Sequence, residues 1–418
     1  SKAYDTIMKT EEQFIATCQA LRKNDPRHTK LDLFGYGSLV DWKQQARKIA
    51  KALEDNTVVV DLTLPKHLCP ESALHLSHFL RCSPSLRHLT MFGKGEETEE
   101  VDRGTIETLK TSIVIEAISR SSLLVKLSLK NVVFGEPCPL EDFLSSTRTL
   151  SDFSYFQDYS TMTYRTAQAI GRGFAKNKSL EHLIWQTPGG LAFIEEVLFG
   201  LFDHIKLKSL CLQTQLTELS SQVLRSLLHC NKTLERFELA LFSSECEEES
   251  PMMASVLAGI AENTGLNKVV FQSESSETDT TLATAWTDML QRNTSMKNLD
   301  VTGDGGWEGD YNYVLSSAVA EGLVNNSTLE TVRLPHEDDY DSEYPFNGPA
   351  WQEVLENNHS LKTLSFSQCL ISVEGFQSLA RGLSCNTSLE TLDLSGTEMT
   401  EEDLIALVDG LEINKTLK

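Results

Sequence analysis

A phrase of the form Asn-x-Ser/Thr-Leu-x-x-Leu-x-Leu recurs along this chain, and its period constrains the fold more than any other feature. Clear copies begin at Asn358 (Asn-His-Ser-Leu-Lys-Thr-Leu-Ser-Phe) and at Asn386 (Asn-Thr-Ser-Leu-Glu-Thr-Leu-Asp-Leu). We number each copy from its first leucine or the residue in that place. The first positions are then His28, Val59, Leu86, Leu124, Leu150, Leu180, Leu207, Leu234, Leu266, Met296, Leu329, Leu361, Leu389 and Leu417. The mean step is about thirty residues, which is typical of leucine-rich repeats.

Each repeat is predicted to contain one strand and one helix. Between the leucine-rich strands lie stretches such as residues 376–383, whose apolar residues recur at helical spacing. The strands stack in parallel roughly 4.8 Å apart, whereas helices need roughly 10 Å, so the stack is expected to curve. The predicted fold is an α/β leucine-rich-repeat solenoid, a horseshoe with parallel strands on the concave face and helices on the convex face. It has about 13 repeats of about 30 residues and resembles the ribonuclease-inhibitor-like class.

The repeat register also predicts the domain organisation. Residues 1–27 are expected to form an N-terminal helical cap, because apolar residues recur at helical spacing between Asp5 and Leu21. Residues 28–418 form the leucine-rich-repeat domain, with an incomplete C-terminal repeat. The sequence stops within a strand at Lys418, so we expect further repeats, a cap or another chain to cover that edge.

Asparagine dominates the position three residues before each strand. It occurs there in nine of the fourteen repeats, and His204 is the one residue in this series that is not small and polar. We expect the asparagine to end a helix in the left-handed conformation and to satisfy loose backbone groups with its side chain. The same residues create apparent glycosylation sequons at Asn177, Asn231, Asn293, Asn326, Asn358, Asn386 and Asn414. A structural role explains these sequons better than a secreted glycoprotein does.

The cellular compartment is inferred from hydropathy and cysteine use. No run of eighteen apolar residues is present, and residues 1–10 lack the apolar core of a signal peptide. The cysteine number is odd, nine, and Cys82, Cys230 and Cys385 occupy equivalent positions five repeats apart, too far to pair. We therefore predict a reduced, cytoplasmic protein without a membrane span.

The negative charge is concentrated in one part of the chain. The net charge is −23, and residues 240–350 contain twenty acids against four bases. The acidic runs each follow a strand and precede a helix, so they are expected on one rim of four consecutive repeats, those starting at Leu234, Leu266, Met296 and Leu329. Aromatic residues lie among them, including Phe242 and Phe346. The predicted partner-binding residues are Glu247, Glu248, Glu249, Glu274, Glu277, Asp279, Asp304, Trp307, Glu308, Asp310, Tyr311, Glu337, Asp338, Asp339, Tyr340, Asp341, Glu343 and Tyr344.

Such a rim suits docking of a protein with a basic surface, because dense like charge steers an oppositely charged partner and aromatic side chains supply anchors. A role in keeping the solenoid soluble is the alternative. Nucleic acid is disfavoured because phosphate binding needs a basic track. At the third, fifth and seventh strand positions six bases and six acids cancel, so the concave face is mixed.

Candidate chemistry elsewhere is weak. His75, His78 and Cys82 share a helical face and could bind zinc, although surface residues of an ordinary helix explain them equally well. Residues 304–310 resemble a calcium loop but lack the EF-hand pattern. No catalytic constellation is recognised, so we expect no catalytic residues, no metal and no cofactor.

The sequence therefore favours a non-enzymatic protein-interaction scaffold that binds its partner through the concave face and the acidic, aromatic rim. Three alternatives remain open: a GTPase activator resembling the Ran-activating family, the sensor portion of a larger receptor or assembly, and a ribonuclease-inhibitor-like function. The cysteine content is low for the last of these.

Overall fold

The computed structural model of the chain is divided into two compact units, Ser1–Leu207 (unit 1) and Lys208–Lys418 (unit 2). Each unit is described by itself. The structure describes residues 11–34, 42–65, 68–93, 101–121, 123–158, 162–187, 193–241, 249–273, 280–301, 311–334, 346–397 and 399–418.

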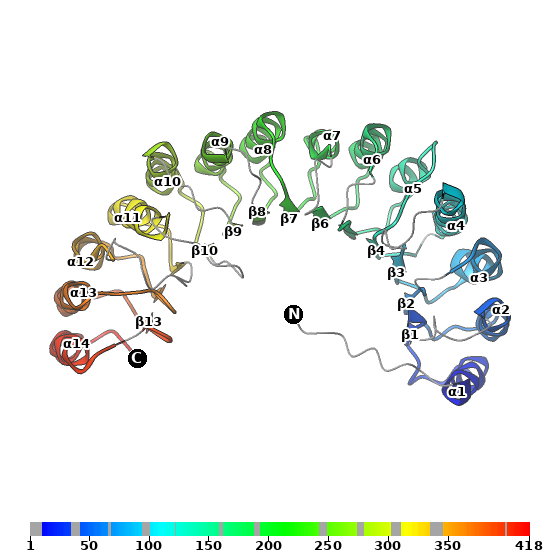
Figure 1. Cartoon of the computed structure of the whole chain (residues 1–418), viewed down its shortest axis with the longest axis horizontal. Coiled ribbons are helices and arrows are strands. Elements are labelled where there is room, and N and C mark those ends of the chain that lie inside the picture. Colours follow the sequence, from blue (N-terminus) through cyan, green and yellow to red (C-terminus); the bar gives the residue numbers. More distant parts are fainter. Residues whose placement is uncertain are drawn as a thin grey trace. The chain divides into compact units, whose positions relative to one another are not determined.

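Unit 1 alternates strands and helices along the chain (Figure 1). Its strands are β1 (Lys30–Asp32), β2 (Asp61–Thr63), β3 (His88–Phe92), β4 (Lys126–Lys130), β5 (Asp152–Phe156) and β6 (His182–Thr187). Its helices are α1 (Glu11–Arg22), α2 (Trp42–Leu53), α3 (Pro70–Cys82), α4 (Val101–Ser119), α5 (Leu140–Ser146), α6 (Tyr164–Lys176) and α7 (Ile194–Phe199). Every neighbouring pair of these strands is parallel and in chain order.

Unit 2 repeats the same arrangement. Its strands are β7 (Ser209–Thr214), β8 (Arg236–Leu241), β9 (Lys268–Ser273), β10 (Asn298–Val301), β11 (Thr331–Arg333), β12 (Thr363–Ser365) and β13 (Thr391–Asp393). Its helices are α8 (Glu218–Cys230), α9 (Glu249–Ala261), α10 (Thr280–Arg292), α11 (Tyr311–Val324), α12 (Gly348–Asn357), α13 (Val373–Cys385) and α14 (Glu401–Ile413). All its neighbouring strands are again parallel.

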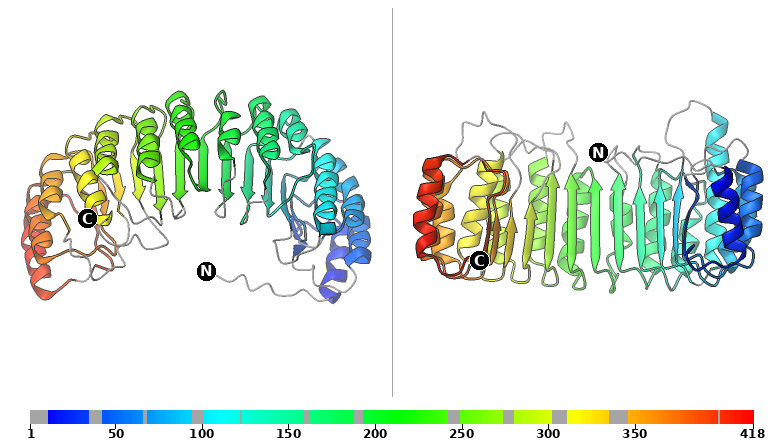
Figure 2. Two further views of the ribbon diagram at one scale, coloured as in Figure 1. Left: turned by 45° about the horizontal axis from the view of Figure 1, so that its top comes forward. Right: turned by 90° about the horizontal axis from the view of Figure 1, so that it is seen from below.

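The strand register matches the repeat register. The fourth position of the repeat is occupied by Leu89 in β3, Leu127 in β4 and Phe153 in β5. These residues lie opposite one another and are fully buried. Successive side chains of a strand point to opposite faces, so the even positions face the helices and the odd positions form the open face of the sheet. Figure 2 shows the strands of each unit side by side, with the helices on the side of the sheet opposite the open face. The predicted α/β leucine-rich-repeat solenoid is confirmed.

The backbone conformation of the repeated asparagines differs from the expectation. The backbone of Asn358 is extended, with φ −83° and ψ 125°, and Asn177 and Asn386 are extended as well. The prediction of a left-handed conformation was wrong because the side-chain oxygen of Asn358, which accepts from the N–H groups of residues 360 and 361, supports the turn between helix and strand without a left-handed backbone. The side chain nevertheless has the predicted role of satisfying backbone groups.

This side chain links neighbouring repeats. Asn358 Nδ2 donates to the carbonyl oxygens of Leu323 at 2.7 Å and Asn326 at 2.8 Å in the preceding repeat. Its Oδ1 accepts from the backbone N–H groups of Ser360 and Leu361 at 3.0 and 2.9 Å. The amide therefore satisfies a carbonyl in the last turn of the preceding helix and fixes the start of its own strand.

Helix α1 lies where a cap is predicted. Phe14, Cys18 and Leu21 are buried, whereas Ile15 is 47% exposed. The side chain of Asn56 donates to the Leu21 carbonyl at 2.8 Å, so α1 takes the place that a preceding repeat helix has elsewhere. The boundary between residues 27 and 28 remains a prediction. Among the described residues, no helix combines the length and the apolar character that crossing a membrane requires.

Candidate functional site

The acidic segments of unit 2 all attach at one edge of its sheet. Residues 242–248, 274–279, 302–310 and 335–345 each connect the end of a strand, β8 to β11, with the following helix. Because these four strands are adjacent and parallel, their carboxyl ends lie side by side at the same edge. The four acidic segments therefore leave the sheet from neighbouring points.

Most predicted partner-binding residues lie outside the described part of the chain. Glu249 and Tyr311 are placed as the first residues of α9 and α11. All the other predicted residues fall outside the described residues: Glu247, Glu248, Glu274, Glu277, Asp279, Asp304, Trp307, Glu308, Asp310, Glu337, Asp338, Asp339, Tyr340, Asp341, Glu343 and Tyr344. Their role as a partner-binding rim remains a prediction.

One aromatic residue of the acidic stretch has a structural position. The ring of Phe346 lies 5.1 Å from the ring of Phe366 and 6.5 Å from that of Trp351, measured between centroids. Trp351 and Phe366 are fully buried. The expectation that Phe346 belongs with the exposed aromatic anchors was therefore wrong, because its ring packs on the core beside α12.

The open face of unit 2 carries acids at the fifth strand position. Glu238 pairs with Arg236 at 2.8 Å, and Asp300 lies 3.5 Å from Arg333 Nη1 and 3.9 Å from Lys268 Nζ. The two Asp300 pairs cross from β9 to β11, so acids and bases alternate on this face. The fifth positions are nearer than the third to the carboxyl edge, so the acids of the open face adjoin the acidic segments.

Hydrogen bonds lower the pKa of two other carboxylates of unit 2, Asp393 at a fifth position and Glu330 at a second position. The side chain and backbone N–H of Ser395 hold the pKa of Asp393 below its usual range, and Ser365 Oγ donates to its other oxygen at 3.1 Å. At the second strand positions, Lys297 and Lys362 bracket Glu330 and lower its pKa to about 2. Both groups therefore remain anionic at neutral pH.

Unit 1 has a different open face, which the sequence analysis missed. Lys130 Nζ of β4 lies 5.3 Å from the ring centroid of Phe92 on β3 and 5.1 Å from that of Phe156 on β5. The ring of Phe34 lies 4.7 Å from that of Phe92. The charges at the odd strand positions did not reveal this cluster. The aromatic residues at the seventh position, Phe92 and Phe156, would have revealed it, because they flank Lys130 at the same position.

One of the three residues considered for zinc binding has another partner. His75 Nε2 accepts from Arg47 Nε at 2.9 Å, and within the described ranges no three His, Cys, Asp or Glu side chains are close enough to hold a metal ion. Burial raises the pKa of the Cys211 thiol to about 12, with a smaller contribution from Glu238, so this cysteine on the open face is protonated. Residues 304–310, considered for calcium, lie outside the described residues.

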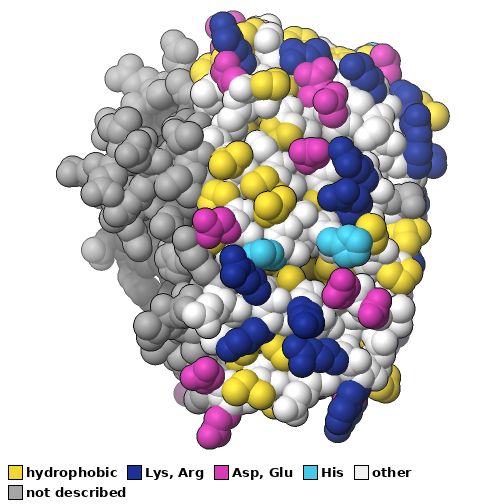
Figure 3. Space-filling view, turned by 90° about the vertical axis from the view of Figure 1, so that its right-hand side faces the viewer, with side chains coloured by type: hydrophobic (Ala, Val, Ile, Leu, Met, Phe, Trp, Pro, Cys, Tyr) yellow, Lys and Arg dark blue, Asp and Glu magenta, His cyan; other side chains and the backbone are white. Residues whose placement is uncertain are grey.

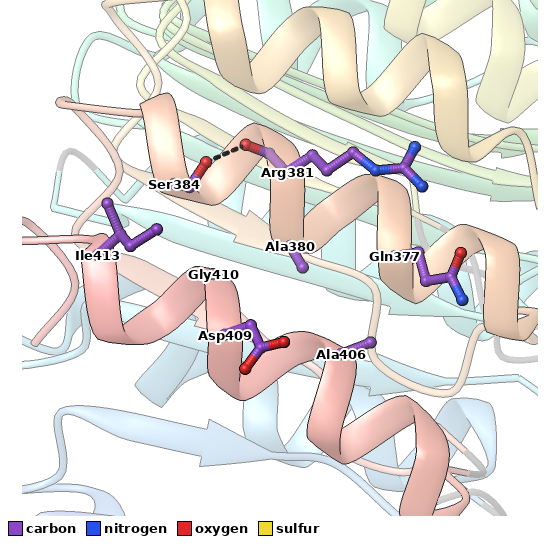
Figure 4. Close-up of a pocket in the computed structure, with 8 residues that line it drawn as sticks. All are labelled: Gln377, Ala380, Arg381, Ser384, Ala406, Asp409, Gly410 and Ile413. Carbon is purple, nitrogen blue, oxygen red and sulfur yellow. Dashed lines mark hydrogen bonds between the residues drawn. The ribbon is translucent and has the colours of Figure 1, made fainter.

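The outer face of unit 2 has shallow grooves between its helices. Figure 4 shows the groove between α13 and α14. It is lined by Gln377, Ala380, Arg381, Ser384, Ala406, Asp409, Gly410 and Ile413. A Cβ on Gly410 would lie 2.3 Å from the Ala380 carbonyl oxygen, so the helices touch at the floor of the groove. Similar grooves separate α10 from α11 and, in unit 1, α6 from α7, which indicates helix packing rather than a dedicated ligand site.

The outer side of unit 1 near its first helices has mixed character. In Figure 3 basic, acidic and hydrophobic side chains are interspersed over this surface. The helix α2 supplies the exposed bases Arg47, Lys48 and Lys51, while Glu11, Glu12 and Glu54 are exposed acids nearby in the sequence. Charge of one sign is therefore a feature of the sequence around the unit 2 segments rather than of this surface.

Comparisons with known proteins add little to this description. No protein-family model matches the sequence, and no curated protein is similar to it. A chain in the crystal structure of the Rad7 and Elc1 complex of yeast is similar, with 12% sequence identity and a TM-score of 0.46 over 93% of this chain and 90% of that chain. A similarity of this size has no bearing on function.

Proposed function

We propose that this chain is a non-enzymatic protein-interaction scaffold with repeats of the ribonuclease-inhibitor-like type. In this proposal, unit 2 binds a protein with a basic surface through its open strand face and the four acidic segments. One observation carries the proposal. The segments follow adjacent parallel strands, β8 to β11, whose fifth positions include the acids Glu238 and Asp300 and one base, Arg333. Carboxylates gathered in this way steer a basic partner and fix its orientation.

The proposed compartment is the reducing interior of the cell. The sequon asparagines support it, because Asn177 is fully buried and Asn358 is 2% exposed, and both amides are occupied by backbone carbonyl groups. Attaching a glycan there would require these hydrogen bonds to break. Cys230 and Cys385 are exposed thiols, which also fits a reducing compartment.

A charge-reversal experiment tests the proposed binding surface. In the rim variant, Glu337, Asp338, Asp339 and Asp341 are replaced by Lys. In a control variant, the exposed helix residues Glu353, Glu356, Glu374 and Glu402 are replaced by Lys, which changes the net charge by the same amount. Affinity capture from native extract at low salt should recover the same proteins with the wild type and the control, and should lose them with the rim variant.

Recovery of the same proteins with all three chains, at low and high salt alike, would exclude the rim as the binding surface. Equal loss with the rim and control variants would show that net charge alone matters, as expected for a solubility role. Only loss confined to the rim variant supports docking at the acidic segments.

A further inference from the structure

A strip of hydroxyl groups crosses the open face of unit 1. Thr90, Ser128 and Ser154 occupy the fifth positions of β3, β4 and β5 and lie directly opposite one another. Neighbouring strands are roughly 4.8 Å apart, so the three side chains form a continuous row. The side chains of Ser128 and Ser154 are only 6% and 4% exposed, respectively.

These hydroxyls retain their capacity to form hydrogen bonds. Within the described residues, neither Ser128 nor Ser154 donates to or accepts from another side chain or backbone group through its hydroxyl. Both point toward the open face, because Leu127, Leu129 and Tyr155 at the even positions are buried under the helices. Their carbon atoms are covered, whereas their oxygens reach the open face, where a ligand oxygen or N–H can take the place of water as hydrogen-bond partner.

Two lysines stand on either side of this strip. Lys126 and Lys130 are on the same strand and face as Ser128, each roughly 6.6 Å from it along the strand. Neither lysine forms an ion pair with a described residue. Asp152 on β5 lies opposite Lys126, whereas Lys130 has Phe92 and Phe156 opposite it on the two neighbouring strands.

Aromatic rings fix one of these cations in place. Phe92 and Phe156 flank Lys130 on the neighbouring strands, so its ammonium group lies between two ring faces at the edge of the strip. A preoriented cation loses little conformational entropy when it pairs with an anion. On the far side, Ile184 of β6 lies opposite Ser154 and supplies an apolar end to the row.

We infer that this strip, made of Thr90, Ser128, Ser154, Lys126, Lys130 and Ile184, is a docking site for an extended acidic segment of a protein partner. A carboxylate of the segment pairs with Lys130, its backbone groups meet the serine hydroxyls, and an apolar side chain covers Ile184. Two strand spacings separate Ser128 from Ile184, roughly 10 Å, which an extended chain spans in about three residues. The motif expected is therefore Asp or Glu about three positions from a large apolar residue.

Protein suits this site better than a longer polyanion does. The site offers two lysines without an ion pair to a described residue, which are too few for a longer polyanion, and the phenylalanine rings favour an apolar companion for the charge. The inference extends the proposed scaffold function to a second surface, and rests on it in taking a protein as ligand. The acidic segments of unit 2 play no part in it.

Differential selection of peptides tests the site. Random peptides of about twelve residues displayed on phage are first selected for binding to the full chain. Phage that also bind the Lys126→Met/Lys130→Met variant are then removed. Peptides that survive should contain Asp or Glu about three positions from a large apolar residue. A synthetic peptide of the most enriched sequence is then measured by fluorescence anisotropy. Lys130→Met should weaken its binding about tenfold, the loss of one charge-assisted contact, and Ser128→Ala about threefold.

Lys48→Met is the matched control, because Lys48 is an exposed lysine on the outer helix α2 of the same unit, and its removal should leave the affinity unchanged. The inference fails if no peptide survives depletion, if the survivors lack acids, or if Lys48→Met and Lys130→Met weaken binding equally. A poly(dT) probe that binds more tightly than the peptide, and is lost with the same lysines, would identify nucleic acid as the ligand and overturn it. These outcomes leave the rim experiment unaffected, so the two proposals fail separately.

Discussion

Replacing Asn358 by alanine should destabilise the chain strongly although no apolar contact is lost. The side chain is 2% exposed and makes four hydrogen bonds to backbone groups, two donated and two accepted. Alanine leaves the N–H groups of Ser360 and Leu361 without this partner, whereas the Leu323 and Asn326 carbonyls each keep one other donor. Each buried unsatisfied group costs about 1 to 3 kcal/mol. Water entering the gap satisfies part of them, so we expect a loss of about 3 to 5 kcal/mol in the free energy of unfolding.

The neighbouring residue provides a matched control. Asn357 is exposed, and its amide makes one hydrogen bond, to the Glu353 carbonyl at 2.9 Å. Asn357→Ala removes the same atoms one position earlier and should change the free energy of unfolding by less than about 0.5 kcal/mol.

Urea unfolding measures the total effect, and native-state hydrogen exchange locates it. The Ser360 and Leu361 amides, which donate to Asn358, should lose protection in Asn358→Ala, while amides in unit 1 keep theirs, because repeats contact only their neighbours. Equal stability of Asn358→Ala and Asn357→Ala, or a loss below about 1 kcal/mol, would refute the view that the asparagine amide joins successive repeats.

Two further predictions concern unit 1. Gly171→Ala should cost about 2 to 3 kcal/mol in thermal or urea unfolding, because a Cβ there would lie 2.1 Å from the Glu196 carbonyl oxygen. Gly135→Ala, whose Cβ would lie 3.3 Å from Thr108 Cβ, should cost clearly less, and equal costs would contradict the close approach of α6 and α7. Burial, helped by Lys178 and Lys206, lowers the pKa of His204 to about 4, so the unfolded state binds the proton first. The free energy of unfolding should therefore be constant above about pH 6.5 and fall by about 3 kcal/mol toward pH 4, measured relative to His204→Gln. Parallel pH profiles of the two chains would contradict this.

The repeat period determined most of the fold that the sequence could predict. Each of the thirteen strands in the described residues begins at the third position of the numbered phrase, because leucines at fixed spacing can be buried only when the repeats stack. The backbone of the asparagines was predicted wrongly, since the sequence shows that a helix ends there but not that the asparagine side chain itself supports the turn into the strand. His204 replaces the asparagine in one repeat and is 3% exposed, so the position tolerates a different polar side chain.

The candidate sites were less accessible from sequence. The ends of β8 to β11, from which the acidic segments continue, lie at one edge of the sheet as parallel strands require, whereas the segments themselves lie outside the described residues. The assignment of Phe346 failed because an aromatic residue among acids can still face the core. The cluster of Phe92, Lys130 and Phe156 was missed since these residues are about thirty positions apart and meet only through the register.

The salt dependence of partner binding tests the scaffold proposal most directly. For a protein captured by the wild type, the dissociation constant is measured between about 50 and 500 mM NaCl with the wild type, the rim variant and the helix control. The account predicts that affinity falls steeply with salt for the wild type and the control. For the rim variant it predicts weak binding with little salt dependence. Equal affinity and equal salt dependence for all three chains would contradict binding through the acidic segments of unit 2.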